Sequence, residues 1–252
     1  LRLAGGLHAL VLSDQDTALA AQYPPHQPTA LWPAVEAAMI THAAFLDAWI
    51  DNAPQTNEVR RAATLISVAQ MLAERFALPL RLSELGASGG LNLMFDKFAL
   101  NLPQAQYGPQ AAAVSLSPEW DGPLPPQAKL DVTERCGVDL NPLDPTQPDD
   151  ALRLLAYLWA DQPDRLQRTR AAIALNTATL TKADAIDWLQ TRLAAPQENT
   201  LHLVYSTIAW QYFPPESQAR GIALLEQAGA QATASAPLAW FAMENDGAGD
   251  GA

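Results

Sequence analysis

Apolar residues recur at helical spacing in the first part of the chain. Four of them lie at positions that share one helical face: Leu3, Leu7, Leu10 and Val11. Residues 34–50 carry a second apolar face of this kind. Asn57 suits a helix N-cap, with Glu58 in the first turn of a helix that runs to Arg75. Residues 1–78 are therefore expected to form a packed helical cap.

Beyond residue 78 the pattern changes to short apolar runs that alternate with helical segments. Residues 80–85 form the first run, which is typical of a buried strand. A second strand is expected to end at residues 138–140, and further strands are expected at 178–182, 201–205 and 238–243. Helices are expected at residues 149–159, 165–176, 185–194 and 216–228. Strands that alternate with helices imply crossovers and parallel pairing. The sequence therefore predicts an α/β, Rossmann-like fold with a mainly parallel sheet and helices on both faces.

A stretch rich in proline, glutamine and glycine interrupts this alternation at about residues 96–130. Such a composition is typical of loops, although short strands are expected at residues 113–116 and 130–133. The predicted organisation is an N-terminal helical cap over residues 1–78, followed by a Rossmann-like domain over 79–252 that contains this insertion. We expect the cap helices to cover a ligand pocket in the second domain.

The composition narrows the range of partners. The 252 residues are 49% hydrophobic and 17% charged, with a formal net charge of −12. Phosphate contacts need clustered lysine and arginine, and no basic run occurs, so nucleic acid and anionic membranes are not expected as partners. The single cysteine, Cys136, allows no intramolecular disulfide, and no histidine or cysteine pair has the spacing of a zinc site. We expect a cytoplasmic protein without a metal that acts on a small-molecule substrate.

The strand–turn–helix over residues 83–92 is the strongest candidate for a ligand site. Parallel sheets bind ligands beyond the carboxyl ends of their strands, where the strand order switches. Gly86 and Gly90 allow backbone conformations and close approaches that other residues resist. The small Ala87 and Ser88 between them leave room for a ligand against the backbone.

Glu84 sets the charge of this turn. It stands two residues before Gly86, where a carboxylate would repel a pyrophosphate but suits a ligand with an ammonium or sulfonium group. A nicotinamide fingerprint would also have glycine at the position of Ser88. A second interpretation stays open, in which the glycines serve only the tight packing of strand and helix.

Two aspartates follow later strands. Asp139 comes directly after the second strand of the sheet, where a ribose diol could donate to both carboxylate oxygens. Asp184 follows the next strand, where it could accept from an exocyclic amine. An aspartate after a strand is also a common helix cap, so each residue alone is a weak signal.

These residues resemble the motifs of class I S-adenosylmethionine-dependent methyltransferases. That family's first motif is an acidic residue, any residue, and then three glycines at alternate positions, which this turn matches with serine at the second glycine. The resemblance implies S-adenosylmethionine as cofactor. The residues that it places around the cofactor are Glu84, Gly86, Ala87, Ser88, Gly90, Asn92, Asp139, Asp184 and Ala185. Asp139 looks like the acid that holds the ribose, and Asp184 looks like the one beside the adenine.

The chain is also similar, over nearly all its length, to an uncharacterised bacterial family that is catalogued only as a domain of unknown function. The segments that carry this likeness are residues 55–59, 84–88, 137–142, 159–162 with Arg165, and 211–214. It brings no established reaction. The expected function, methyl transfer to an unidentified acceptor, therefore depends on the methyltransferase resemblance.

Two departures from the methyltransferase pattern matter. The stretch between Glu84 and Asp139 is longer than in typical members, so the insertion must loop out if Asp139 is to reach the ribose. Residues 206–209 read Ser-Thr-Ile-Ala, where amino-methylating enzymes carry Asn-Pro-Pro and an aromatic residue.

No catalytic base is predicted. Methyl transfer from a sulfonium is an in-line displacement that depends largely on positioning. His202 lies within an apolar strand, and Cys136 is expected to be buried and inert. The residues expected on the substrate side are Asn57, Glu58, Trp159, Arg165, Tyr205 and Tyr212.

Two other functions stay open. The first is a non-catalytic module that binds a nucleoside-like ligand or a protein on the same scaffold. The second is a serine hydrolase, because Gly86 and Gly90 stand two residues before and after Ser88, as in a nucleophile elbow. Asp184 and then His202 would follow in the order that such a triad requires.

Overall fold

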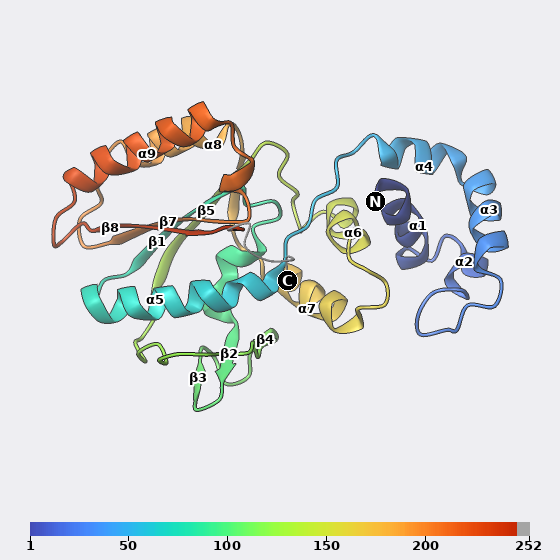
Figure 1. Ribbon diagram of the computed structural model, residues 1–252, viewed down its shortest axis with the longest axis horizontal. Coiled ribbons are helices and arrows are strands. Elements are labelled where there is room, and N and C mark those ends of the chain that lie inside the picture. Colours follow the sequence, from blue (N-terminus) through green and yellow to red (C-terminus); the bar gives the residue numbers. More distant parts are fainter. Residues whose placement is uncertain (246–252) are drawn as a thin grey trace. The chain divides into compact units, whose positions relative to one another are not determined.

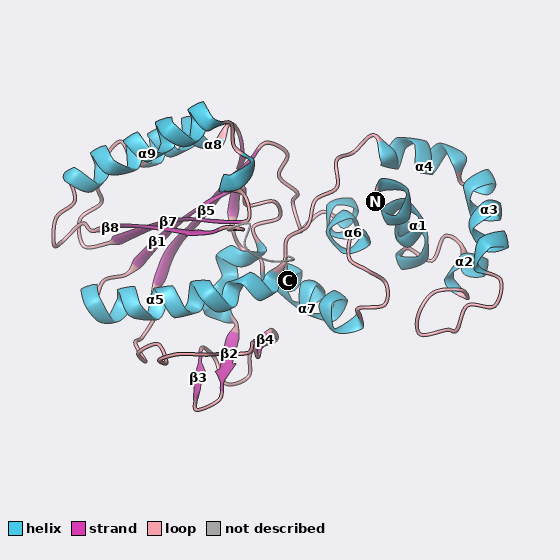
Figure 2. Ribbon diagram, in the orientation of Figure 1, coloured by secondary structure: helices cyan, strands magenta, loops and turns pink. Residues whose placement is uncertain are grey.

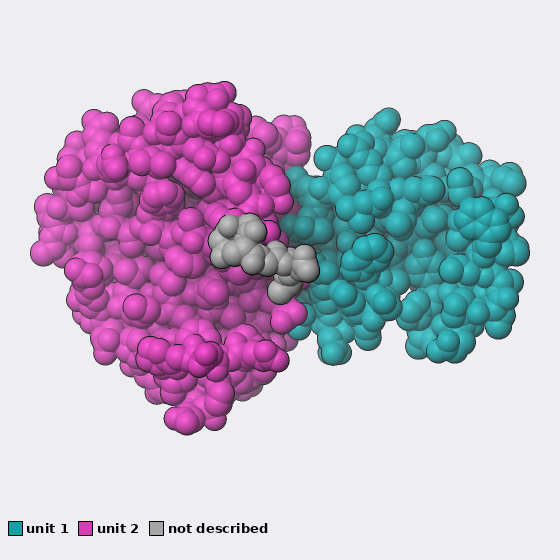
Figure 3. All heavy atoms as spheres, viewed as in Figure 1, with its two compact units in different colours: residues 1–57, 143–174 teal, residues 58–142, 175–252 magenta. Residues whose placement is uncertain are grey.

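A computed structural model describes residues 1–245 (Figure 1), and these fall into two compact units. Unit 1 comprises Leu1–Asn57 and Leu143–Ala174, and unit 2 comprises Glu58–Pro142 and Leu175–Ala252 (Figure 3). The division differs from the predicted boundary at residue 78, because residues 58–78 belong with the sheet. In addition, residues 143–174, which follow the second predicted strand of the sheet and contain two helices, belong to the same unit as the N-terminal helices.

Unit 1 is entirely helical where it has regular structure. Its elements are α1 (Arg2–Leu12), α2 (Thr17–Ala20), α3 (Leu31–Thr41), α4 (Ala43–Ile50), α6 (Pro148–Ala156) and α7 (Pro163–Leu175). Ala9 and Trp49 share an apolar cluster with Ala156 and Tyr157, which explains why α6 joins the N-terminal helices. Burial of apolar surface of this kind is the main force that holds such a unit together.

The helix predicted over residues 34–50 is broken in two at His42. The His42 backbone leaves the helical conformation, with φ −110° and ψ 27°, so that α3 ends and α4 begins there. Its Nε2 lies 3.3 Å from Oδ2 of Asp16, which precedes α2. The interruption of the helix at His42 therefore coincides with a side-chain contact to Asp16, which the spacing of apolar residues does not reveal.

A five-stranded parallel sheet forms the centre of unit 2. Its strands are β1 (Leu80–Leu85), β5 (Val132–Asp139), β6 (Thr179–Lys182), β7 (Leu201–Thr207) and β8 (Leu238–Met243), in the order β6-β5-β1-β7-β8. The α/β, Rossmann-like prediction is confirmed. The strand order reverses between β1 and β7, which makes the carboxyl end of that pair the topological switch point.

Helices cover both faces of this sheet. Figure 2 shows α8 (Ala185–Arg192) and α9 (Pro215–Ala230) over one face and α5 (Ala62–Phe76) over the other. Leu85, Val138 and Val204 of the sheet are fully buried in an apolar cluster with Leu189 and Leu225 of the covering helices. Each side chain buried in this way contributes on the order of 1.5–3 kcal/mol.

Three short 3₁₀ helices lie at the loops of unit 2: η1 (Val59–Arg61), η2 (Leu91–Lys97) and η3 (Trp210–Tyr212). Asn57 is not the N-cap that was predicted. Glu58 takes that role instead, because its side chain accepts a hydrogen bond of 3.0 Å from the N–H of Arg60 at the start of η1. The long helix α5 follows directly.

The insertion folds into a small second sheet. β2 (Ala99–Leu102), β3 (Ala105–Tyr107) and β4 (Ser115–Leu116) pair in the order β3-β2-β4. The short strand predicted at residues 130–133 is wrong as a separate element, because Val132 already begins β5. Tyr107 donates a 2.6 Å hydrogen bond to the carbonyl of Pro125 and so closes the insertion on itself.

Two further observations concern the whole described chain. No helix within residues 1–245 is both long enough and apolar enough to cross a membrane. The same residues contain no group of three or more histidine, cysteine, aspartate or glutamate side chains that could hold a metal ion.

Candidate functional site

The turn after β1 lies at the switch point. Gly86 and Gly90 adopt left-handed conformations, with φ +71° and +67°, which favour glycine. A Cβ on Gly86 would lie 2.5 Å from the Cβ of Ala209, and one on Gly90 would lie 2.9 Å from Leu180. The close approaches that these glycines allow are thus made by the protein itself, as the packing interpretation of the turn expects.

Ser88 and Asp139 meet in this turn. The N–H of Ser88, which has φ +52°, donates a 2.9 Å hydrogen bond to Oδ2 of Asp139. Oδ1 of the same carboxylate accepts from the N–H of Asn141 at 2.9 Å. The aspartate that ends β5 therefore points at the turn after β1, although the insertion separates the two in sequence.

Ala87 contributes packing at this place rather than open space. It is buried, and a Cβ on Gly137 of the neighbouring strand would lie 2.5 Å from the Ala87 Cβ. The backbone N–H groups of Gly86 and Ala87 both donate to the carbonyl of Val138, at 2.9 and 3.0 Å. The turn is thereby fixed to the end of β5.

Asp184 and Ala185 do not join the turn through any described contact. Oδ1 of Asp184 accepts hydrogen bonds from the N–H groups of Ile186 and Asp187, at 2.9 and 3.0 Å, and so caps α8. Ala185 is buried in the apolar cluster under that helix. The helix-cap alternative accounts for Asp184, because an aspartate directly before a helix satisfies backbone donors that have no partner within the helix.

Three oxygen atoms at the carboxyl edge are buried without a hydrogen-bond partner among residues 1–245: Glu84 Oε2, Asn92 Oδ1 and Tyr205 Oη. Glu84 is only 1% exposed, and Tyr205 lies beside it in register on the next strand. The two side chains are not paired by the distance and angles of a hydrogen bond, although Tyr205 lies near enough to oppose the rise in the pKa of Glu84. A buried polar atom without a partner costs about 1–3 kcal/mol, so a cluster of them calls for an explanation.

Arg61 brings a positive charge to this edge. Its Nη1 donates a 2.8 Å hydrogen bond to the carbonyl of Thr207, at the end of β7. Burial lowers the pKa of Arg61, while the nearby carboxylates of Glu58, Glu84 and Glu244 raise it. Burial raises the pKa of Glu84 well above its ordinary value, and Arg61 opposes that rise.

The sequence reasoning missed Arg61 and Glu244. Both reach the site through contacts between distant segments: Arg61 with the end of β7, and Glu244 with the loop that follows the same strand. The one signal in the sequence is position, since Glu244 directly follows the last predicted strand.

The predicted substrate-side residues divide between the two units. Asn57, Trp159 and Arg165 belong to unit 1, and Trp159 is 57% exposed. Glu58, Tyr205 and Tyr212 belong to unit 2. Of these, Tyr205 is buried and Tyr212 is 73% exposed. Whether the two groups face a common substrate stays a prediction.

The structure does not assemble a hydrolase triad around Ser88. His202 Nε2 lies 2.8 Å from Ser83 Oγ, under α8, and Asp184 caps that helix. Cys136 was predicted to be buried but is only half-buried; its partial burial and its hydrogen bond to Glu134 raise the pKa of the thiol, which disfavours the nucleophilic thiolate.

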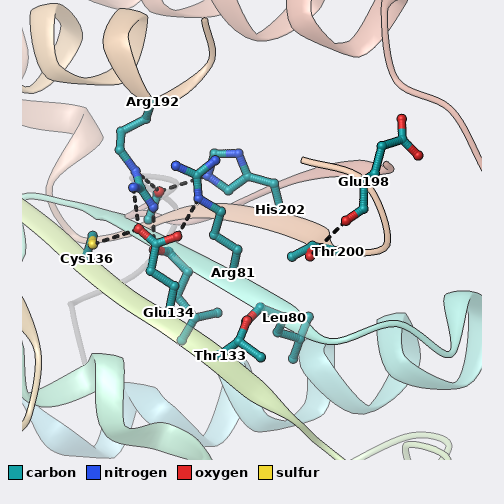
Figure 4. A network of polar contacts seen from close by, with 11 residues as sticks. Leu80, Arg81, Thr133, Glu134, Cys136, Arg192, Glu198, Thr200 and His202 are labelled. Carbon is teal, nitrogen blue, oxygen red and sulfur yellow. Dashed lines mark hydrogen bonds and ion pairs between the residues drawn. The ribbon is translucent and has the colours of Figure 1, made fainter. Parts of the chain in front are cut away.

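A second polar cluster, here called the amino-half network, lies nearer the start of the strands (Figure 4). Glu134 of β5 accepts from Arg192 through Oε1 and from Arg81 through Oε2, the latter at 2.7 Å. Arg192 also donates to Ser83 Oγ at 3.1 Å, next to the contact between Ser83 and His202. This network ties three central strands to the last residue of α8.

Comparisons with known proteins identify the family. The whole chain, residues 1–252, matches the family described as "Uncharacterized protein conserved in bacteria (DUF2332)", and the chain belongs to it. No curated protein matches the chain, and no solved structure does.

Proposed function

We propose that unit 2 binds S-adenosylmethionine and that the protein is a methyltransferase acting on a small-molecule acceptor. The observation that carries this proposal is the contact between Ser88 and Asp139 at the switch point between β1 and β7. In parallel sheets this place is where nucleoside ligands bind. A carboxylate there is suited to accept hydrogen bonds from a ribose diol.

The charge of the carboxyl edge supports a cationic ligand. Glu58, Glu84 and Glu244 lie close enough to Arg61 to raise its pKa. Even with Glu84 uncharged in the free protein, the carboxylates of Glu58 and Glu244 beside one guanidinium favour a ligand with an ammonium and a sulfonium, and they disfavour a pyrophosphate. S-adenosylmethionine has both cationic groups and a single carboxylate.

The buried oxygens without partners fit the amino-acid end of this cofactor. A primary ammonium has three N–H donors, and Glu84 Oε2, Asn92 Oδ1 and Tyr205 Oη are acceptors that lack donors within the described chain. Arg61 would hold the carboxylate of the same ligand. The amino-acid end would then satisfy polar groups whose burial otherwise costs free energy.

Leu140 and Tyr212 would form an apolar rim for the adenine. Leu140 directly follows Asp139 and is 65% exposed, and Tyr212 in η3 is also exposed. An aromatic base gains free energy by covering such side chains. We assign the base to this rim rather than to Asp184, whose carboxylate already caps α8.

When bound, the cofactor supplies an electrophilic methyl group. The residues of this chain would orient it, exclude water from the carboxyl edge and hold the head group, since methyl transfer depends mainly on positioning. No side chain is assigned as a base.

Isothermal titration with S-adenosylhomocysteine tests the proposal. We expect micromolar binding to the wild type and a loss of at least tenfold in Asp139→Asn, because the amide offers one acceptor in place of two. Asp187→Asn is the matched control, since Asp187 lies on α8 and pairs with Arg220. Absence of binding at millimolar ligand would refute the proposal.

A non-catalytic binding module is the second candidate. It is favoured by residues 206–209 after β7, which read Ser-Thr-Ile-Ala where amino-methylating enzymes carry Asn-Pro-Pro and an aromatic residue. Binding of S-adenosylhomocysteine with no methylated product across a broad acceptor panel would support it. One methylated product would exclude it.

A further inference from the structure

The loop after β7 is arranged around the carboxylate of Glu244. Oε1 of Glu244 accepts from Ser206 Oγ at 2.7 Å and from the N–H of Trp210 at 3.1 Å. Oε2 accepts from the N–H groups of Ala209 and Gln211, at 3.1 and 3.3 Å. One side chain directly after β8 thus binds four donors, one from the end of β7 and three from the loop that follows that strand.

This loop holds a backbone conformation that its sequence resists. Ile208 has φ +53°, in the left-handed region that β-branched residues rarely occupy. Its N–H donates a 2.7 Å hydrogen bond to the carbonyl of Met243, directly before Glu244. Such a conformation persists only where the surroundings fix it, and it is common at functional sites.

The same loop shapes the candidate ligand site on two sides. Ala209 packs closely against Gly86: a Cβ added to Gly86 would lie 2.5 Å from the Cβ of Ala209. The carbonyl of Thr207 accepts the hydrogen bond that orients Arg61. A shift of the loop would therefore move both the glycine turn and the guanidinium.

We infer that Glu244 is a positioning residue, whose carboxylate holds residues 206–211 in the shape that fixes the head-group end of the ligand site. The inference rests on the proposed function as far as ligand binding is concerned. The hold of Glu244 on the loop does not depend on the ligand. Glu244 itself need not touch the ligand, because it acts through Ala209 and Thr207.

The test uses Glu244→Gln, which keeps the size of the side chain but sets an amide NH₂ against backbone donors. We expect the affinity for S-adenosylhomocysteine to fall at least tenfold at a temperature where the variant is fully folded. Binding of 5′-methylthioadenosine, which lacks the amino-acid head group, should change less than threefold. A general loss of structure would weaken both ligands alike, so a split between them excludes it; faster amide exchange in the loop then distinguishes positioning from the loss of a charge.

Glu198→Gln is the matched control, because Glu198 Oε2 accepts a 2.6 Å hydrogen bond from Ser235 Oγ in a similar pair far from the turn. It should leave both affinities unchanged. If Glu244→Gln does not fold, Ser206→Ala can replace it, because it removes one of the four donors. We expect it to lower the affinity for S-adenosylhomocysteine more than that for 5′-methylthioadenosine, by a smaller factor than Glu244→Gln.

Amide hydrogen exchange separates failure of this inference from failure of the proposed function. The N–H groups of Ala209, Trp210 and Gln211 should be protected in the wild type and exchange at least tenfold faster in Glu244→Gln. If the wild-type protein binds neither ligand, the proposed function is refuted. The exchange rates of these three N–H groups would still test whether Glu244 holds the loop. Unchanged exchange, or equal losses for the two ligands, would overturn the inference.

Discussion

A part-buried polar cluster and a buried one lie on the same sheet, and they differ in how their hydrogen bonds are completed. In the amino-half network, Glu134 is bound by Arg81 and Arg192, and Ser83 by Arg192 and His202. At the carboxyl edge, Glu84, Asn92 and Tyr205 each bury an oxygen that has no partner among residues 1–245. The polar groups of the first cluster are hydrogen-bonded within the chain. The oxygens of the second cluster would need donors from a bound ligand.

This difference separates a structural role from a binding role. Paired buried charges add rigidity, and removing one partner leaves the other uncompensated. Unpaired buried acceptors cost stability, which a protein tolerates where a ligand later supplies the donors. The comparison therefore predicts that the amino-half network controls folding and that the carboxyl edge controls binding.

The largest effect on stability is expected for Glu134→Ala. The two arginines would lose their shared carboxylate, and partial exposure of Glu134 limits the loss in free energy of unfolding to about 2 kcal/mol. Urea denaturation measures it. Binding of S-adenosylhomocysteine should stay within twofold of wild type, and a tenfold loss would contradict the separation of the two clusters.

Gly86→Ala should be destabilising by about 1.5 kcal/mol, because the new Cβ meets Ala209 and the left-handed backbone disfavours alanine. The double variant with Ala209→Gly should recover part of this loss, since it removes the collision but not the backbone strain. Thermal unfolding of Gly86→Ala, Ala209→Gly and the double variant measures the loss of stability and its recovery. Equal stability of single and double variants would show that the contact is unimportant.

Glu84→Gln should affect binding rather than folding. The free energy of unfolding near neutral pH should not fall, because burial already favours the uncharged acid in the free protein and an amide carries no cost of ionisation. The affinity for S-adenosylhomocysteine should fall about tenfold, as expected for a lost hydrogen bond to a charged group. Calorimetry gives the affinity and urea denaturation the stability; the opposite pattern would assign Glu84 to the structural cluster.

The two clusters should also respond to pH with opposite signs. Burial, with Arg81 and Arg192 nearby, lowers the pKa of His202 to about 3. The folded state then binds fewer protons than the unfolded state, so this contribution to stability is present above pH 6.5 and is lost as pH falls toward 3. Between pH 7 and 5.5 it amounts to about 1 kcal/mol.

Glu134 acts in the same direction over a lower range. Burial alone would raise its pKa, but Arg192, Cys136 and Arg81 lower it to about 2, so its contribution is lost as pH falls from 4.5. Glu84 has a raised pKa, so its contribution is present below pH 4.5 and is lost as pH rises through the folded value. His202→Gln should flatten the acid side of the stability profile, and Glu84→Gln the alkaline side. Unfolding curves from pH 4 to 9 that show no such change would contradict these assignments.

Local patterns in the sequence were enough to predict most of the sheet. The apolar runs at residues 80–85 and 201–205 predicted strands of a parallel sheet, and both are strands of that sheet. The break at His42 and the cap formed by Glu58 could not be predicted from spacing, because each depends on a side-chain contact.

The candidate site was predictable only in part, for a similar reason. Ser88 and Asp139 meet, as strand-end positions in a parallel sheet suggest. Asp184 serves its helix instead, and a single sequence cannot distinguish a cap from a ligand contact. Arg61 reaches the end of β7 across 146 residues of chain, and Glu244 reaches Ser206 across 38. Such contacts follow from tertiary packing, which has no periodic signature.

A crystal structure of the protein with S-adenosylhomocysteine tests the central claim most directly. The account predicts the ribose on Asp139 beside Ser88, and the amino-acid head group between Arg61 and the unpartnered oxygen of Glu84. A ligand bound elsewhere, or a carboxyl edge still without ligand at saturating concentration, would contradict it.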